Sequence, residues 1–215
     1  MDLTPATDSQ SPVLVLAHGA GAGSAHPWMR RVARELAERG VSVITFDFPY
    51  VREGRRVPDR GPALEGAWAE AWTAAIQLAR HDGREPTAFF AGGKSMGGRI
   101  ASQADAKALL TPLPAGLVFF GYPLHPPGKP AQRRDKHLPA ITTPMLFVHG
   151  TRDPFGTSDE FAALVQTLPH AAIYTVAQGD HSLIAPKKAT DPASSFERAL
   201  DAVARWIREG HIIER

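Results

Sequence analysis

A serine at the centre of residues 93–97, Gly-Lys-Ser-Met-Gly, lies between two segments of different character. The run before it, residues 87–91, is short, apolar and rich in strand formers, and residues 98–104 are predicted to begin a helix. A serine in a tight strand-to-helix turn is held in a strained conformation and stands exposed at the carboxyl edge of its sheet. The glycines on either side leave room for the turn, and the helix dipole favours negative charge beside the serine oxygen. The pattern therefore predicts that Ser95 is an exposed nucleophile.

Apolar runs that suit buried strands alternate with segments of helical period along most of the chain. The helix expected at 27–39 illustrates the second pattern, because Trp28, Val32 and Leu36 recur on one face. Strands joined by helical crossovers make a parallel sheet, with sites at the carboxyl ends of its strands. The fold class we expect is α/β, a doubly wound, mostly parallel six-stranded sheet with helices on both faces. The predicted strands cover residues 13–18, 41–46, 87–91, 116–120, 145–149 and 172–176, and the predicted helices cover 27–39, 63–81, 98 to about 110, 158–168 and 194–209.

Local composition gives the expected domain organisation. Residues 1–11 are polar and carry neither the basic nor the apolar region of a secretory signal, so we expect a flexible N-terminal tail. Residues 12–215 then form a single domain, since a chain of 215 residues suits one core. A long loop is expected at 49–61. The stretch 122–144 holds six prolines and is too short and too proline-rich for a separate cap domain.

The composition of the whole chain limits the classes of function. There is no cysteine, which excludes a disulfide framework and a cysteine nucleophile. The net charge of +2 does not argue for nucleic acid, and no apolar run approaches the roughly 18 residues of a membrane span. Nothing resembles a metal site. We therefore expect a protein of the cytoplasm, the default compartment, with no nucleic-acid, membrane or metal partner.

Two clusters of basic residues lie in loops rich in proline and glycine. Each is interpreted either as a solvated loop or as a surface that favours an acidic substrate. The clusters are Arg52, Arg55, Arg56 and Arg60, and Lys129, Arg133, Arg134 and Lys136.

Candidates for a base and an acid follow Ser95 along the chain. A serine hydroxyl becomes a strong nucleophile only when a base takes its proton, and an acid has to orient that base. Asp153 follows the predicted strand 145–149, where such an acid belongs, and His181 lies on a glycine-flanked loop after the last predicted strand. About one strand–helix unit separates each residue from the next, so all three reach the same edge of the sheet. We therefore predict a Ser95–Asp153–His181 triad, in the chain order serine, acid, histidine.

Other residues near these positions have alternative readings. Asp153 could instead cap the turn after its strand, and Asp180 is a rival acid, although it adjoins His181 in sequence. His149 is expected to be a core histidine with satisfied hydrogen bonds. His18 is expected to fix the glycine-rich turn that follows it.

An acyl-transfer site also needs two backbone N–H groups directed at the developing oxyanion. The residue after the serine, Met96, is the first expected donor. The small residues at 18–23 let a ligand approach the backbone closely, and we expect Ala20 to be the second donor, with Gly21 as the alternative. This loop does not match the G-x-G-x-x-G pattern of a dinucleotide site.

The substrate pocket is expected to be walled by the loops 22–28, 49–60 and 122–138 and to lack a lid. Such an open site favours short or compact acyl groups. His125 and His137, in the proline-rich loop, are expected at the surface or at the pocket. The predicted substrate-binding residues are Gly21, His26, Trp28, Tyr122 and His125.

Four motifs together resemble the α/β-hydrolase superfamily along nearly the whole chain after residue 12. They are His-Gly-Ala-Gly-Ala-Gly at 18–23, Gly-Gly-Lys-Ser-Met-Gly-Gly-Arg at 92–99, Phe-Phe-Gly-Tyr-Pro-Leu-His-Pro at 119–126 and Gly-Thr-Arg-Asp-Pro-Phe-Gly at 150–156. The short form without a cap is similar to the dienelactone-hydrolase-like branch, and more narrowly to small bacterial hydrolases related to a subunit of a eukaryotic chromatin-modifying complex. Dienelactone hydrolases use a cysteine nucleophile, whereas this chain has Ser95. The resemblance implies that Ser95, Asp153 and His181 form the triad.

The leading hypothesis is a serine hydrolase, a carboxylesterase or thioesterase that forms an acyl-enzyme with a small ester or thioester substrate. It needs no cofactor and acts as a monomer or homodimer. The alternatives are a non-catalytic interaction module of the same fold and an acyltransferase on the same triad.

Overall fold

The computed structural model describes residues 1–186, 188 and 192–210. These residues form one sheet in the strand order β1-β3-β2-β4-β5-β6-β7, and its neighbours are parallel except for β1 and β3. The strands are β1 (Asp2–Thr4), β2 (Val13–Ala17), β3 (Ser42–Phe46), β4 (Phe89–Lys94), β5 (Leu117–Phe120), β6 (Met145–Gly150) and β7 (Ala171–Val176). The helices are α1 (Pro27–Glu38), α2 (Pro49–Arg52), α3 (Gly61–His81), α4 (Met96–Ala106), α5 (Ser158–Thr167) and α6 (Pro192–Glu209), with a short 3₁₀ helix at Leu138–Ala140.

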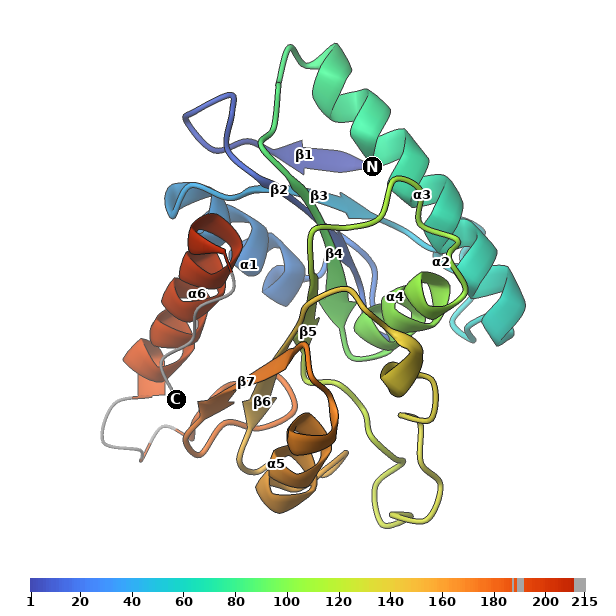
Figure 1. Cartoon of the computed structure of the whole chain (residues 1–215), viewed down its shortest axis with the longest axis vertical. Helices are drawn as coiled ribbons and strands as arrows, with labels where there is room; N and C mark the ends of the chain where they lie inside the picture. Colours follow the sequence, from blue (N-terminus) through green and yellow to red (C-terminus); the bar gives the residue numbers. More distant parts are fainter. Residues whose placement is uncertain (187, 189–191, 211–215) are drawn as a thin grey trace.

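Helices cover both faces of the sheet. In Figure 1, α1 and α6 lie on one face, and α3, α4 and α5 lie on the other. Because β2, β4, β5 and β6 run parallel and side by side, their carboxyl ends meet at one edge. The predicted α/β class and doubly wound architecture are confirmed. No helix in the described part of the chain is long and apolar enough to cross a membrane.

The sheet has seven strands instead of the predicted six, because part of the expected flexible tail is ordered. Asp2–Thr4 pairs with the edge strand β3. Ala6 is buried, and its N–H donates to Ser42 Oγ at 3.0 Å. The Arg84 guanidinium donates to the Ala6 carbonyl at 2.7 Å. This segment is ordered by long-range pairing with a free sheet edge, which its own polar composition does not reveal.

Two predicted boundaries also differ from the structure. Pro49–Arg52, inside the expected loop, forms the short helix α2 with proline at its start. Helix α4 ends at Ala106 instead of continuing to about residue 110. The Leu109 N–H donates to the Ala104 carbonyl at 2.9 Å, and Ala108 takes a positive φ of 53°. This is a Schellman stop with alanine where glycine is usual, so the sequence carries no stop signal there.

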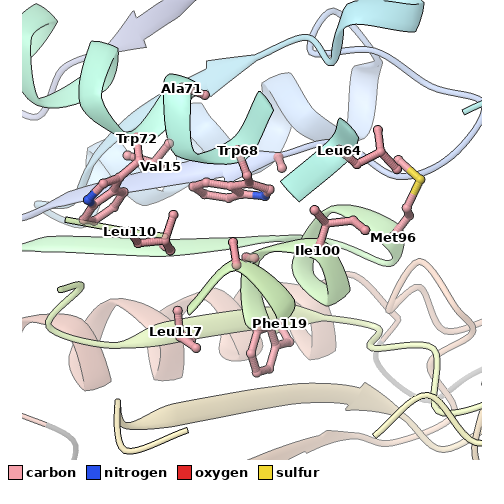
Figure 2. Close-up of a cluster of buried hydrophobic side chains, with 14 of the residues drawn as sticks. Val15, Leu64, Trp68, Ala71, Trp72, Met96, Ile100, Leu110, Leu117 and Phe119 are labelled. Carbon is pink, nitrogen blue, oxygen red and sulfur yellow. The ribbon is translucent and has the colours of Figure 1, made fainter. Parts of the chain in front are cut away.

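The core beneath the site is formed where α3 and α4 pack on the sheet. The apolar face of α3 is buried, and Figure 2 shows its Leu64, Trp68 and Trp72 directed at α4 and the strands. The Trp68 indole N–H donates to the Gly97 carbonyl in the first turn of α4 at 3.1 Å. This bond ties the start of α4, and with it the preceding turn, to the core.

Candidate active site

Ser95 lies in a strained turn between β4 and α4. Its φ and ψ are 51° and −116°, a conformation that side-chain-bearing residues rarely adopt. A Cβ on Gly93 would lie 2.5 Å from the Gly97 carbonyl carbon, and one on Gly97 would lie 2.5 Å from the Ala17 carbonyl oxygen. Only glycine fits at either position, so the β2 backbone and the glycines together hold the turn that exposes the serine side chain.

The three predicted triad residues meet at the carboxyl edge of the sheet. His181 Nε2 lies 2.9 Å from Ser95 Oγ, and His181 Nδ1 lies 2.8 Å from Asp153 Oδ2. Because an ionised carboxylate accepts hydrogen bonds and does not donate them, Nδ1 carries the proton in its bond to Asp153. Nε2 is then free to accept the serine proton. The second Asp153 oxygen accepts from the Phe155 N–H at 2.9 Å, and the aspartate side chain is fully buried. Both carboxylate oxygens are therefore satisfied, and the histidine tautomer is defined.

Asp180, the rival acid, has a different set of partners. Its Oδ1 accepts from the backbone N–H groups of Ser182 at 2.8 Å and Ile184 at 3.0 Å. The side chain therefore closes the loop that carries His181, and the His181 ring bonds to Asp153 instead.

Three side chains hold the His181 loop in place, and only Trp28 was predicted from the sequence, as a substrate-binding residue. Lys94 Nζ donates to the His181 carbonyl at 2.7 Å, and the Trp28 indole N–H donates to the Ser182 carbonyl at 3.0 Å. The Phe155 ring lies against the imidazole, with 4.2 Å between ring centroids. Burial lowers the pKa of Lys94 to about 8. Lys94 sits beside the serine in sequence, which was the available signal, but its contact with residue 181 exists only in the tertiary structure.

His18 and His149 differ in whether their ring nitrogens have hydrogen-bond partners. His18 Nδ1 donates to the Gly19 carbonyl at 2.8 Å, and its Nε2 accepts from the Phe48 N–H at 3.2 Å, so it fixes the turn as expected. His149 was expected to have satisfied hydrogen bonds, and this prediction is wrong. Its two ring nitrogens are buried without a hydrogen-bond partner among the described residues. Burial lowers the pKa of His149 to about 4, so the ring is neutral against Phe161.

A cavity of about 600 Å³ opens in front of Ser95. Ala20 and Met96, the predicted oxyanion donors, line it together with Ser95 and His181. The backbone N–H groups of Ala20 and Met96 donate no hydrogen bond within the part of the chain that the structure describes. Figure 2 shows the Met96 side chain beside Leu64, which also lines the cavity.

Each of the three predicted loops contributes to the cavity wall, but not every predicted substrate-binding residue does. His26 and Trp28 line it. The prediction for Tyr122 is wrong, because this residue is buried in the core and its hydroxyl donates to the Arg134 carbonyl at 2.9 Å. The prediction for His125 is wrong as well, because its side chain is buried, with Nδ1 2.8 Å from the Pro126 carbonyl and Nε2 3.2 Å from Glu160. Gly21 is outside the lining, between Ala20 and Ala22, which are part of it.

His137, which had been expected at the surface or the pocket, is half-buried outside the cavity lining. Its Nε2 lies 2.8 Å from the Ser102 hydroxyl, and that hydroxyl donates to the Arg99 carbonyl. The imidazole is therefore the donor in its contact with Ser102. Burial lowers the pKa of His137 to about 4, and this neutral ring braces α4.

Two arginines lie on the cavity wall, and only one of them was predicted from the sequence as part of a basic cluster. Arg99, on α4, and Arg134, on the proline-rich loop, both line the cavity. Arg134 belongs to one of the predicted basic clusters. Arg99 was not selected, although its position three residues after Met96 on a helix indicates the same face.

Comparisons with known proteins agree with this geometry at the level of the fold. Carboxyl esterase 2 from the fungus Tuber melanosporum is 19% identical, with a TM-score of 0.69 over 98% of this chain and 80% of its own. A dienelactone hydrolase from Anabaena variabilis is 18% identical, with a TM-score of 0.67 over 96% and 89%. A serine hydrolase without a lid from Xanthomonas campestris is 19% identical, with a TM-score of 0.61 over 96% and 84%. At these identities the likeness shows the shared fold alone.

The family itself is shown by a match in sequence. The model of the alpha/beta hydrolase domain matches residues 10–208, which include every residue of the site described above. The resemblance drawn from the motifs is thereby confirmed at the level of the superfamily. The chain belongs to the alpha/beta hydrolase family.

Proposed function

We propose that this protein is a serine hydrolase that cleaves a small ester or thioester through an acyl-enzyme intermediate. The observation that carries the proposal is the continuous hydrogen-bonded series from Asp153 through His181 to Ser95, with the serine oxygen at the floor of an open cavity. An interaction module needs no such alignment. The esterases among the structural relatives are consistent with the same chemistry.

In the first half of the reaction, Ser95 Oγ attacks the substrate carbonyl carbon while its proton moves to His181 Nε2. The carbonyl oxygen becomes an oxyanion that accepts hydrogen bonds from the Ala20 and Met96 N–H groups, beside the positive end of the α4 dipole. Asp153 stabilises the imidazolium that forms. The bond from the carbonyl carbon to the leaving group breaks, His181 protonates the leaving alcohol or thiol, and the acyl group stays on the serine.

In the second half, His181 takes a proton from water, and the hydroxide attacks the acyl-enzyme at the same carbonyl carbon. The bond to Ser95 Oγ breaks, the serine recovers its proton from His181, and the acid leaves. His26 and Trp28 contact the substrate in this proposal, since both line the cavity. An alcohol in place of water would make the same triad an acyltransferase.

The site fits the lidless, dienelactone-hydrolase-like branch with serine in place of cysteine. Between β5 and β6 the described chain holds only the 3₁₀ helix at Leu138–Ala140. A cap of several helices is therefore absent from this connection.

The test is reaction with a fluorophosphonate probe together with hydrolysis of p-nitrophenyl butyrate. We expect the probe to label Ser95 and the Ser95→Ala variant to lose both labelling and turnover, by about 10⁴-fold or more in kcat. The variant should keep its fold, because the serine side chain projects into the cavity and packs little surface. Unchanged turnover by folded Ser95→Ala protein would remove the serine assignment, and an unlabelled, inactive wild type would favour the interaction module.

A further inference from the structure

Two arginines at the cavity have no carboxylate partner among the described residues. Arg99 and Arg134 both line it, and neither has a carboxylate within ion-pair distance among the described residues. The side chain of Arg99 donates to Gln103 Oε1 at 3.0 Å, while its Nε is buried with no acceptor. A cationic side chain at a cavity wall that has no carboxylate partner favours an anion bound in the cavity.

Two other basic residues of the neighbouring loops are paired within the protein. Arg55 pairs with Glu53 at 2.6 Å and with Asp59 at 2.8 Å. Arg133 pairs with Asp135 and Glu160. Arg134 has no such partner among the described residues, and it is the residue of its cluster that lines the cavity.

The single carboxylate among the lining residues does not compensate the arginines. It belongs to Asp59, which is already paired with Arg55. Burial lowers the pKa of Arg99, and the charge of Arg134 lowers it as well, while Tyr122 and Glu65 act in the opposite direction. An anion between the two arginines would offset their like charges.

The arginines are also placed at the reacting group. Arg99 is in the first turn of α4, and its backbone N–H donates to the Ser95 carbonyl at 3.1 Å. Arg134 faces the same space from the opposite loop, where Tyr122 fixes its backbone carbonyl at 2.9 Å. A small molecule bound at Ser95 therefore shares the cavity with both arginines.

We propose that Arg99 and Arg134 bind a carboxylate carried by the substrate, so that the substrates are esters or thioesters with a free carboxylate on the acyl or the alcohol side. This inference rests on the proposed hydrolase function. Arginine suits the role because its planar fork binds a carboxylate through two parallel hydrogen bonds.

The first test is kinetic and uses matched pairs of esters. The first pair has the carboxylate on the acyl side: the p-nitrophenyl half-ester of adipic acid is compared with its neutral carbamoyl analogue. The butyrate esters of 3-hydroxybenzoic acid and 3-hydroxybenzamide place it on the alcohol side. We expect the acidic member of at least one pair to have the higher kcat/KM, and Arg99→Gln and Arg134→Gln each to reduce the acid-to-amide ratio about 10- to 100-fold.

Arg80→Gln is the matched control, because it removes the same charge at the exposed end of α3, outside the cavity lining. It should leave the acid-to-amide ratio unchanged. Equal kcat/KM for acid and amide in both pairs, or an equal loss of ratio in Arg80→Gln, would overturn the proposal while leaving Ser95-dependent hydrolysis intact.

The second test does not depend on turnover. Calorimetric titration measures binding of adipate and of adipamide to the wild-type protein and to Arg99→Gln. We expect adipate to bind at least tenfold more tightly than adipamide and to lose that advantage in the variant. Indistinguishable affinities would contradict the carboxylate site even if the protein proved to hydrolyse no ester.

Discussion

At the floor of the cavity, where β4 turns through Ser95 into α4, a Cβ on Gly97 would meet main-chain oxygens at 2.5 and 2.6 Å. On the wall formed by residues 122–138, Arg134 presents a side chain with no carboxylate partner among the described residues. The floor is defined by backbone packing, which leaves no freedom for a different side chain. The wall is defined by side-chain chemistry on a loop. We therefore expect changes at the floor to affect catalysis and stability, and changes at the wall to affect substrate choice.

The largest effect is expected from a substitution that breaks the hydrogen-bonded series from Asp153 through His181 to Ser95. Asp153→Asn should lower kcat for p-nitrophenyl butyrate about 10²- to 10⁴-fold, because the amide no longer stabilises the imidazolium or holds His181 in the accepting tautomer. Steady-state kinetics with a circular-dichroism check of folding measures this. Asp180→Asn is the control, since Asp180 bonds only to its own loop in the described structure. A crippled Asp180→Asn beside a fully active Asp153→Asn would exchange their roles.

A stability measurement tests the floor directly. Gly97→Ala should lower the free energy of unfolding by about 3 kcal/mol, because the added methyl group forces the backbones of β2 and α4 apart. Gly66→Ala is the matched control on exposed α3, where nothing lies within 4 Å of the added carbon. That change should raise stability by up to about 1 kcal/mol. Urea denaturation compares the two, and equal effects would mean that the floor is not tightly packed.

The contact between Lys94 and the His181 loop is tested by pH. Lys94 has its pKa lowered from 10.5 to about 8 by burial. Below pH 8 both folded and unfolded chains hold the proton, and the buried charge reduces stability in full. Between pH 8 and 10.5 the folded state has released a proton that the unfolded chain still binds, so the free energy of unfolding rises with pH.

Relative to Lys94→Met, the free energy of unfolding of the wild type should therefore rise by about 2 kcal/mol between pH 7.5 and 9.5. Urea denaturation of both proteins at the two pH values gives the difference. A difference that stays constant with pH would show that Lys94 keeps an ordinary pKa.

The smallest expected effect concerns the wall. Butyrate esters should have a kcat/KM at least about tenfold above that of palmitate esters, a difference of about 1.4 kcal/mol in transition-state binding. The cavity lacks a cap, and a long acyl chain would have to pass the guanidinium groups of Arg99 and Arg134. Kinetics with the two p-nitrophenyl esters measures the ratio. A higher kcat/KM for the palmitate ester would mean that the cavity wall contains a channel for long acyl chains.

Much of the floor could be predicted from the sequence. A strand, a Gly-x-Ser-x-Gly turn and a helix are local signals, and the order of Ser95, Asp153 and His181 after successive strands places them at one edge of any parallel sheet. The alternation of apolar runs and helical periods predicted the fold class for the same reason. Each of these inferences depends on residues close together in sequence or on a general rule of chain topology.

The tertiary structure decided what depends on contacts between distant segments. Asp2–Thr4 becomes a strand only because the edge of β3 is free. Tyr122 and His125 do not line the pocket, because both are buried against other parts of the chain. Lys94 gains its role through the carbonyl of residue 181. Arg99 and Arg134 meet at the cavity from separate elements. A sequence records which side chains exist, but their partners and their exposure to water are set by packing across the whole chain, and these determine the chemistry of the wall.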